Sequence, residues 1–259
     1  MASWGREDGP DPVQNYAKSE HLPMGASLTM TSARYRLLMI KTQPMNVGVR
    51  GLFALGGSGV LALLLTTPAL AHHPTGNQTP STFIEGFLSG LGHPVIGLDH
   101  LAFVVAAGLL AATRPRGIWC PVAFVLAALV GTGIHLQQIS LPGAELLISA
   151  SVLAIGLLLA LDSQQLSTGA MAGLAALAGI FHGYAYGESI IGATPAPLTA
   201  YLLGFTTIQL GISVAAFWLS RYGLSLKAAT EAQASPNLRK AGWAIGGIGL
   251  ALTYAQVLG

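Results

Sequence analysis

Long apolar stretches separated by short polar segments fill the chain from about residue 95 to its end. Six of them approach the roughly 20 residues that a helix needs to cross a hydrocarbon core. The pattern therefore predicts an all-α polytopic membrane protein with a six-helix transmembrane bundle. We expect its spans at about 95–112, 118–139, 143–161, 168–187, 197–219 and 240–258, after a shorter amphipathic lead-in at 81–92.

The N-terminal part of the chain has a different character. Residues 1–44 are polar and show no sustained apolar period, which indicates a disordered extension or a mis-assigned start. From Met45 a short basic segment precedes the apolar run 52–65, and Ala69-Leu70-Ala71 is a small-x-small cleavage site. This is the pattern of a signal peptide.

We therefore expect translation to start at Met45 or Met39 and cleavage to leave His72 as the exoplasmic N-terminus. A genuine extension with an uncleaved first helix is the alternative. The expected division of the chain is a signal peptide at 45–71, an exoplasmic segment at 72–94 and the transmembrane domain at 95–259.

Composition supports a membrane protein and limits its chemistry. Hydrophobic residues make up 52% and charged residues 8%, with a mean hydropathy of +0.60, far less charge than a soluble surface requires. The single cysteine, Cys120, cannot form an internal disulfide and leaves no thiolate cluster. A metal site here must use nitrogen and oxygen ligands.

The basic residues favour one orientation. With the mature N-terminus outside, the loops after spans one, three and five face the cytoplasm. The basic residues after residue 71 lie in or beside the first and third of these loops, as the positive-inside rule expects: Arg114, Arg116, Arg221, Lys227, Arg239 and Lys240. We therefore expect a multi-pass protein of the cell inner (plasma) membrane.

Two polar clusters interrupt the apolar stretches, one from His93 to His100 and one from His182 to Glu188. An ionisable side chain in a span costs about 2.5 to 3.5 kcal/mol, so such residues persist mainly where they pair, line a cavity or bind an ion. We expect Pro94 at the first helical position, with His93 capping the helix and His100 two turns below it.

Imidazole and carboxylate together indicate a divalent metal site. His182 and Glu188 are separated by about 600° of helical rotation, so His182 is the stronger ligand candidate of that cluster. The predicted metal ligands are His93, Asp99, His100, His182 and Glu188, and the accessory candidates are His72, His73, His135 and Glu145.

Structural roles compete with each of these assignments. A structural role is the stronger explanation for two accessory candidates: hydrogen bonding inside its helix for His135, and a helix N-terminus that favours a carboxylate for Glu145. Asp99 and His100 would also serve as an internal pair that locks two helices. His182 between small residues would serve packing, and His72 and His73 would be incidental residues after a cleavage site.

The two clusters resemble motifs of the HupE/UreJ family of nickel and cobalt membrane permeases. The motif His-x5-Asp-His is matched by His93, Asp99 and His100. The motif Phe-His-Gly-x-Ala-x-Gly-x-Glu is matched from Phe181 to Gly187, but Glu188 comes one residue early and Ser189 takes the expected position. The resemblance covers about residues 45–259.

The resemblance implies a secondary permease for uptake of nickel or cobalt, with the ion as transported substrate and no organic cofactor. Inward movement would follow the membrane potential or a proton gradient, and the sequence carries no Walker-type phosphate loop. An intramembrane zinc-dependent hydrolase and a metal-binding assembly protein for a metalloenzyme are the alternatives. We expect no enzymatic activity and no nucleic-acid partner, and the oligomeric state stays open.

Overall fold

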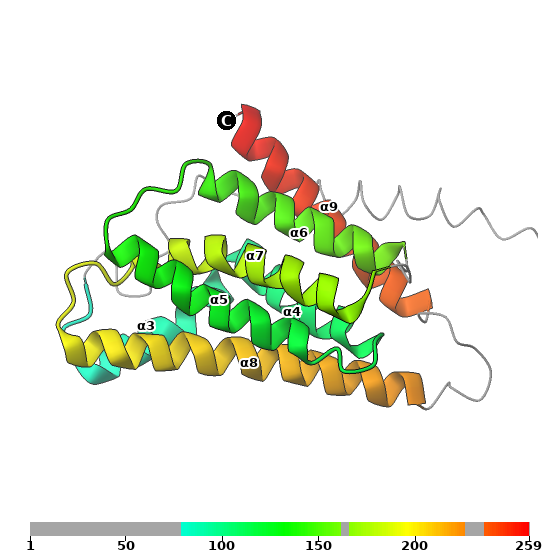
Figure 1. Cartoon of the computed structure of the whole chain (residues 1–259), viewed down its shortest axis with the longest axis horizontal. Helices are drawn as coiled ribbons and strands as arrows, with labels where there is room; N and C mark the ends of the chain where they lie inside the picture. The colour runs from blue at the N-terminus through cyan, green and yellow to red at the C-terminus, as the bar shows by residue number, and fades with distance from the viewer. Residues whose placement is uncertain (1–78, 162–165, 226–235, 259) are drawn as a thin grey trace, which may run out of the picture. The chain divides into compact units, whose positions relative to one another are not determined.

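The computed structural model describes residues 79–161, 166–225 and 236–258, all within one unit, Val47–Gly259. The predicted extension, the signal peptide, His72 and His73 lie outside these ranges. The described residues form helices and no strand, as Figure 1 shows, which confirms the all-α class. The helices are α3 (Phe83–Ile96), α4 (Leu98–Ala112), α5 (Trp119–Leu136), α6 (Ala144–Ala160), α7 (Thr168–Glu188), α8 (Pro195–Ser225) and α9 (Pro236–Leu258).

Each of the six predicted spans becomes a helix, α4 to α9. By length and composition, three helices of the described residues are able to cross a membrane: α5, α8 and α9. The bent pair of α3 and α4 makes a fourth if it counts as one broken span. Helices α6 and α7 are not among these spans. Helix α6 has only 17 residues, and the histidine, tyrosines and glycines of α7 lower its mean hydropathy. The number of six crossings stays a prediction.

The first polar cluster lies on two helices rather than one. Thr82 and Glu85 form a capping box that starts α3 well before Pro94, which lies inside this helix. Pro94 has no N–H to donate one turn back, and the extended Gly97 ends the helix. Helices α3 and α4 then meet at an angle of 80°. The expectation that His93 caps a helix starting at Pro94 was wrong.

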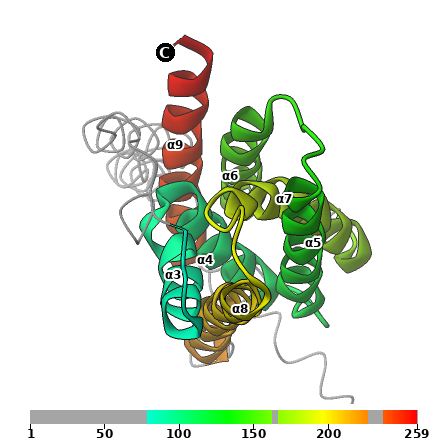
Figure 2. The same cartoon turned by 90° about the vertical axis from the view of Figure 1, so that its left-hand side faces the viewer.

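Close glycine contacts hold the helices together in pairs. At these glycines a Cβ atom would collide with backbone of the partner helix, so the small residue permits the approach. The contacts join α3 to α8 at Gly90 and Tyr201, α5 to α7 at Gly183 and Ala128, and α6 to α9 at Gly156 and Gly246. Helix α4 packs against members of all three pairs, and most of its residues are buried. Figure 2 shows it between the other helices.

Arginine side chains mark one end of the bundle. Arg221 Nη2 donates to the carbonyl of Arg114, just after α4, at 3.3 Å, and Arg239 Nε donates to the carbonyl of Ala160, the last residue of α6, at 3.0 Å. A cation at a helix C-terminus is favourable. We call this end, defined by Arg114, Arg221 and Arg239, the arginine end.

Large apolar side chains cover much of the outside of the helices. Exposed examples on α5 and α8 are Trp119, Leu126, Val130, Trp218 and Leu219. Apolar surface of this extent is typical of a protein that contacts lipid. Together with the apolar helices, it indicates a multi-pass membrane protein.

Candidate metal centre

Three imidazoles from three different helices meet away from the arginine end. His93 of α3, His100 of α4 and His182 of α7 are exposed by only 9%, 5% and 0%. The ring centroids of His93 and His100 lie 5.6 Å apart, and those of His100 and His182 lie 4.9 Å apart. We call these three residues the imidazole cluster. The 80° bend between α3 and α4 brings His93 and His100 together, in place of the shared helical face expected from their spacing.

A chain of hydrogen bonds fixes the orientation of His182. The Ser151 hydroxyl donates to the carbonyl of Ile148 at 2.6 Å, so its oxygen accepts from Nε2 of His182 at 3.0 Å. Nδ1 of His182 is then left with a lone pair, which accepts from Nδ1 of His100 at 2.8 Å. This network assigns the tautomers and directs the Nδ1 lone pair of His182 toward His100.

His93 is held by two hydroxyl groups. Its Nδ1 lies 2.7 Å from Ser189 Oγ and 3.2 Å from the Tyr201 hydroxyl, which itself donates to the carbonyl of Tyr186 at 2.8 Å. Ser189 is buried and occupies the position at which the motif quoted above has glutamate. The side chain that faces the imidazole cluster at this end of α7 is therefore Ser189 and not Glu188.

Asp99 places a carboxylate at the edge of the imidazole cluster. Its Oδ1 accepts from the backbone N–H of His100 at 2.8 Å and lies 3.9 Å from His100 Nδ1, and the side chain is 24% exposed. Gly97 makes room for both residues, since a Cβ there would stand 2.7 Å from His100 Cδ2 and 3.0 Å from Asp99 Oδ1. The elbow between α3 and α4 thus shapes the centre.

The remaining candidates within the described residues lie outside the imidazole cluster. Glu188 and Glu145 are exposed. The carboxylates of Asp99 and Glu188 are near enough to repel the charge of Glu145, so the three acidic groups share one end of the bundle. His135 is half-buried, and its ring packs on Tyr184 with centroids 4.3 Å apart. We call Glu145 and Glu188 the outer carboxylates.

As they stand, no three His, Cys, Asp or Glu side chains of the described residues are arranged to hold a metal ion. The Nδ1 atoms of His100 and His182 face each other across a hydrogen bond at 2.8 Å, so an ion between them would displace the shared proton. Two nitrogens bound at about 2.1 Å to one ion would stand about 3.0 to 3.4 Å apart. To bind one ion together, the two Nδ1 atoms would therefore move apart by a few tenths of an ångström.

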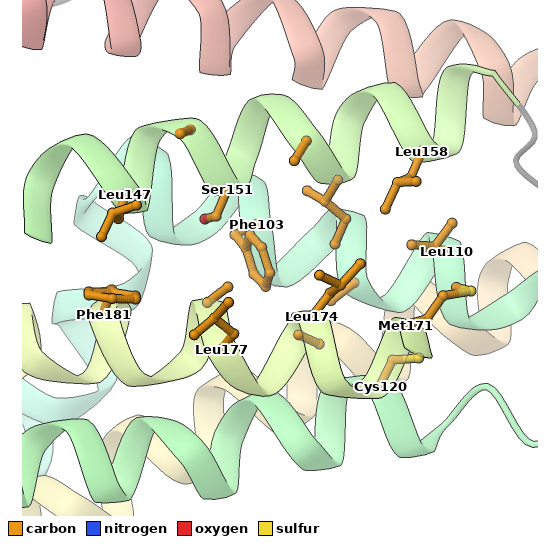
Figure 3. A pocket seen from close by; sticks show the side chains of 16 residues that line it. Phe103, Leu110, Cys120, Leu147, Ser151, Leu158, Met171, Leu174, Leu177 and Phe181 are labelled. Atoms are coloured by element: carbon orange, nitrogen blue, oxygen red, sulfur yellow. The ribbon is translucent and has the colours of Figure 1, made fainter. Parts of the chain in front are cut away.

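An apolar cavity of about 260 Å³ adjoins the imidazole cluster, between α6 and α7 with Phe103 of α4 as one wall (Figure 3). The ring of Phe103 lies 4.8 Å from that of His182. The Ser151 hydroxyl, which also contacts His182, is the polar group in a lining made otherwise of apolar side chains and Cys120. No carboxylate or imidazole lines this cavity, so its chemistry suits apolar groups rather than a hydrated ion.

Sequence reasoning missed the uncharged polar residues around the imidazole cluster. The hydroxyl groups of Ser151 and Ser189 contact histidines directly. The ring of Tyr186 packs on His100, and the hydroxyl of Tyr201 donates to the backbone carbonyl of Tyr186. Their signal in the sequence is weak, because each is an uncharged polar or amphipathic side chain in or beside an apolar helix. Burial, which distinguishes them here, cannot be deduced from one sequence.

A family profile described as "HupE / UreJ protein" matches residues 60–252. The chain belongs to the HupE/UreJ family. It is also 31% identical over 166 residues to the protein named Protein HupE from Rhizobium leguminosarum bv. viciae, covering 61% of this chain and 83% of that protein. No solved structure matches it.

The HupE/UreJ family is a transporter-type family associated with nickel or cobalt uptake or with maturation of urease and hydrogenase. The profile covers both motifs and all three members of the imidazole cluster. Membership confirms the resemblance drawn from those motifs and agrees with a multi-pass membrane protein. It leaves the ion, its direction of movement and its ligands to be proposed.

Proposed function

We propose that this chain is a secondary permease that takes up Ni²⁺ or Co²⁺ across the cytoplasmic membrane. His93, His100, His182 and Asp99 hold the ion on its way through the bundle. The observation that carries the proposal is the meeting of three buried imidazoles from three helices beside one carboxylate.

The ligand types fit the proposed ions. Ni²⁺ and Co²⁺ are suited to imidazole nitrogen, and a carboxylate partly neutralises the charge that enters the bundle. The donors come from helices α3, α4 and α7, so small shifts of one helix change the ligand set. Protonation of an imidazole would expel the ion, which offers a route to proton coupling.

The membrane potential supplies a sufficient driving force. Two positive charges that move inward gain about 4.6 kcal/mol per 100 mV, at about 2.3 kcal/mol for each charge. The outer carboxylates lie at the end of the bundle that holds Asp99, where they would attract the ion. With the mature N-terminus exoplasmic, His72 and His73 would collect metal before it enters.

A zinc-dependent hydrolase and a metalloenzyme assembly protein remain the competing functions. The one observation that supports a hydrolase is the apolar cavity beside Ser151, which would accommodate an apolar substrate. An assembly protein would bind the ion at the same imidazoles without moving it. Movement of the ion across the membrane distinguishes a permease from both the hydrolase and the assembly protein.

The test is uptake of radiolabelled nickel and cobalt by cells that express the full chain, compared with Asp99→Asn and His100→Gln at equal membrane levels. Both variants should fall to the level of empty cells, and the preferred ion identifies the substrate. Glu85→Gln is the matched control, because it also neutralises one carboxylate, and glutamine preserves the capping box at Thr82.

Two results would contradict the proposal in different ways. Wild-type cells that accumulate no metal, while the purified protein still binds it, would indicate the assembly protein or the hydrolase. Wild-type uptake by both variants would remove Asp99 and His100 from the ion's path.

A further inference from the structure

A stripe of buried side chains on α8 leads away from the imidazole cluster toward the arginine end. Tyr201, Phe205, Gln209 and Ser213 follow one another at four-residue spacing, and all four are 0% exposed. Residues so spaced share one face of a helix. The Tyr201 hydroxyl contacts His93, and the Ser213 hydroxyl donates to the carbonyl of Val104 on α4 at 3.0 Å. Gln209 therefore lies between the imidazole cluster and the middle of α4.

The amide of Gln209 has no partner in the described part of the chain. Neither its oxygen nor its nitrogen makes a hydrogen bond, although both are buried. Buried polar groups are nearly always paired, and an amide left unpaired is destabilising. An apolar side chain would fill this position without that cost, so the presence of glutamine favours a bound guest that pairs with its amide.

A second unpaired group lies beside the imidazole cluster. The hydroxyl of Tyr186, on α7, is buried without a hydrogen-bond partner among the described residues. Its ring lies 4.6 Å from that of His100 and 5.4 Å from that of Phe205, which precedes Gln209 by one turn of α8. Phe205 thus has Tyr186 of α7 beside its ring and Gln209 one turn further along its own helix.

We propose that Gln209 forms an inner binding site for the transported divalent cation, after the imidazole cluster and with the Tyr186 hydroxyl on the way. This inference rests on the proposed permease function. The amide oxygen binds the ion or the water that accompanies it. An uncharged oxygen holds Ni²⁺ or Co²⁺ less tightly than imidazoles do, and transport requires a site that the ion leaves readily.

The test compares Gln209→Leu with Gln209→Glu in the full chain, by Co²⁺ uptake in cells and Co²⁺ binding to purified protein. Gln209→Leu removes the oxygen and should lower the uptake rate by about tenfold, the loss expected for one bond to a charged group. Its Co²⁺ affinity at the imidazole cluster, followed by visible absorption, should stay at the wild-type value. Gln209→Glu keeps an oxygen donor and should transport faster than Gln209→Leu.

Gln256→Leu on α9 is the matched control, because it makes the same change at an exposed position and should transport like wild type. Wild-type uptake by Gln209→Leu would overturn the inner site and leave the permease intact. An equal loss in Gln209→Leu and Gln209→Glu would also overturn it, since an oxygen donor would then not matter. Failure of the wild type itself to transport would instead overturn the proposed function.

Discussion

The imidazole cluster and the outer carboxylates lie at the same end of the bundle but differ in burial and in how firmly other groups hold them. The imidazoles are buried, come from three helices and are fixed by hydroxyl groups and by one another. Glu145 and Glu188 are exposed at helix ends. A buried group acts through short bonds, whereas an exposed charge acts through a screened field.

This difference separates two kinds of residue that the sequence alone groups together. Removal of an imidazole should destroy a specific arrangement, and the loss should be large at any salt concentration. Removal of an outer carboxylate should weaken attraction of the ion, and the loss should be small and dependent on salt. Four substitutions test the contrast, in order of expected effect.

The largest effect is expected from His182→Gln. His182 is fully buried between His100 and Ser151, so its loss removes a proposed ligand and the hydrogen bonds that orient His100. Co²⁺ affinity of the purified protein, measured by visible absorption, should fall by more than about 100-fold. His135→Gln is the control and should stay within about twofold, because that ring packs on Tyr184 outside the imidazole cluster.

Equal losses in the two histidine variants would contradict the contrast. They would show that His135 belongs to the ion's ligands and that the structure divides the histidines incorrectly. An unchanged affinity in His182→Gln would remove the imidazole cluster as the binding site.

A smaller effect is expected from Gly97→Ala, which perturbs the imidazole cluster without removing a ligand. The added methyl would stand 2.7 Å from Cδ2 of His100, so the ring must shift. The backbone at Gly97, with φ −70° and ψ 110°, suits any residue, and the effect is therefore steric. Co²⁺ affinity should fall by about tenfold, as when a ligand loses its support.

Gly133→Ala is the matched control for Gly97→Ala. A Cβ at Gly133 meets nothing within 4 Å, and alanine in a helix interior is slightly more stable than glycine. Affinity should therefore be unchanged. If both variants bind Co²⁺ like wild type, the space at Gly97 does not set the position of His100.

Much of the fold followed from the apolar pattern, and its limits are physical. Helices α4 to α9 lie where the apolar stretches predicted them, because the period and length of those stretches are local properties. The bend at Gly97 was missed because the capping box at Thr82 starts α3 earlier and puts Pro94 inside it. The proline position alone allowed either arrangement.

The candidate site was predicted in part for the same reason. His93, Asp99, His100 and His182 stand out as ionisable residues in apolar stretches, and the structure brings them together. Glu188 and Glu145 carry the same signal but are exposed, which depends on how whole helices pack. Ser189 and Gln209 carry almost no signal, because a polar residue is recognised as functional only when its burial and partners are known.

The smallest effect is expected from the outer carboxylates. Glu145→Gln and Glu188→Gln should each lower the rate of metal uptake about two- to threefold at low ionic strength and hardly at all near 0.5 M salt, because screening removes long-range attraction. Uptake of radiolabelled Ni²⁺ or Co²⁺ at both salt concentrations measures this. A salt-independent loss above about tenfold would instead place the residue among the ligands.

Stability then separates attraction of the ion from a role in the helices. Glu145 lies in the first turn of α6, where a carboxylate favours the helix, but the like charges of Asp99 and Glu188 oppose it, so Glu145→Gln should leave the thermal midpoint nearly unchanged. Glu188 is the last residue of α7, where a negative charge opposes the helix dipole. Glu188→Gln should therefore keep or raise the midpoint while it slows uptake. That combination would be difficult to explain by helix stability and would assign Glu188 to attraction of the ion.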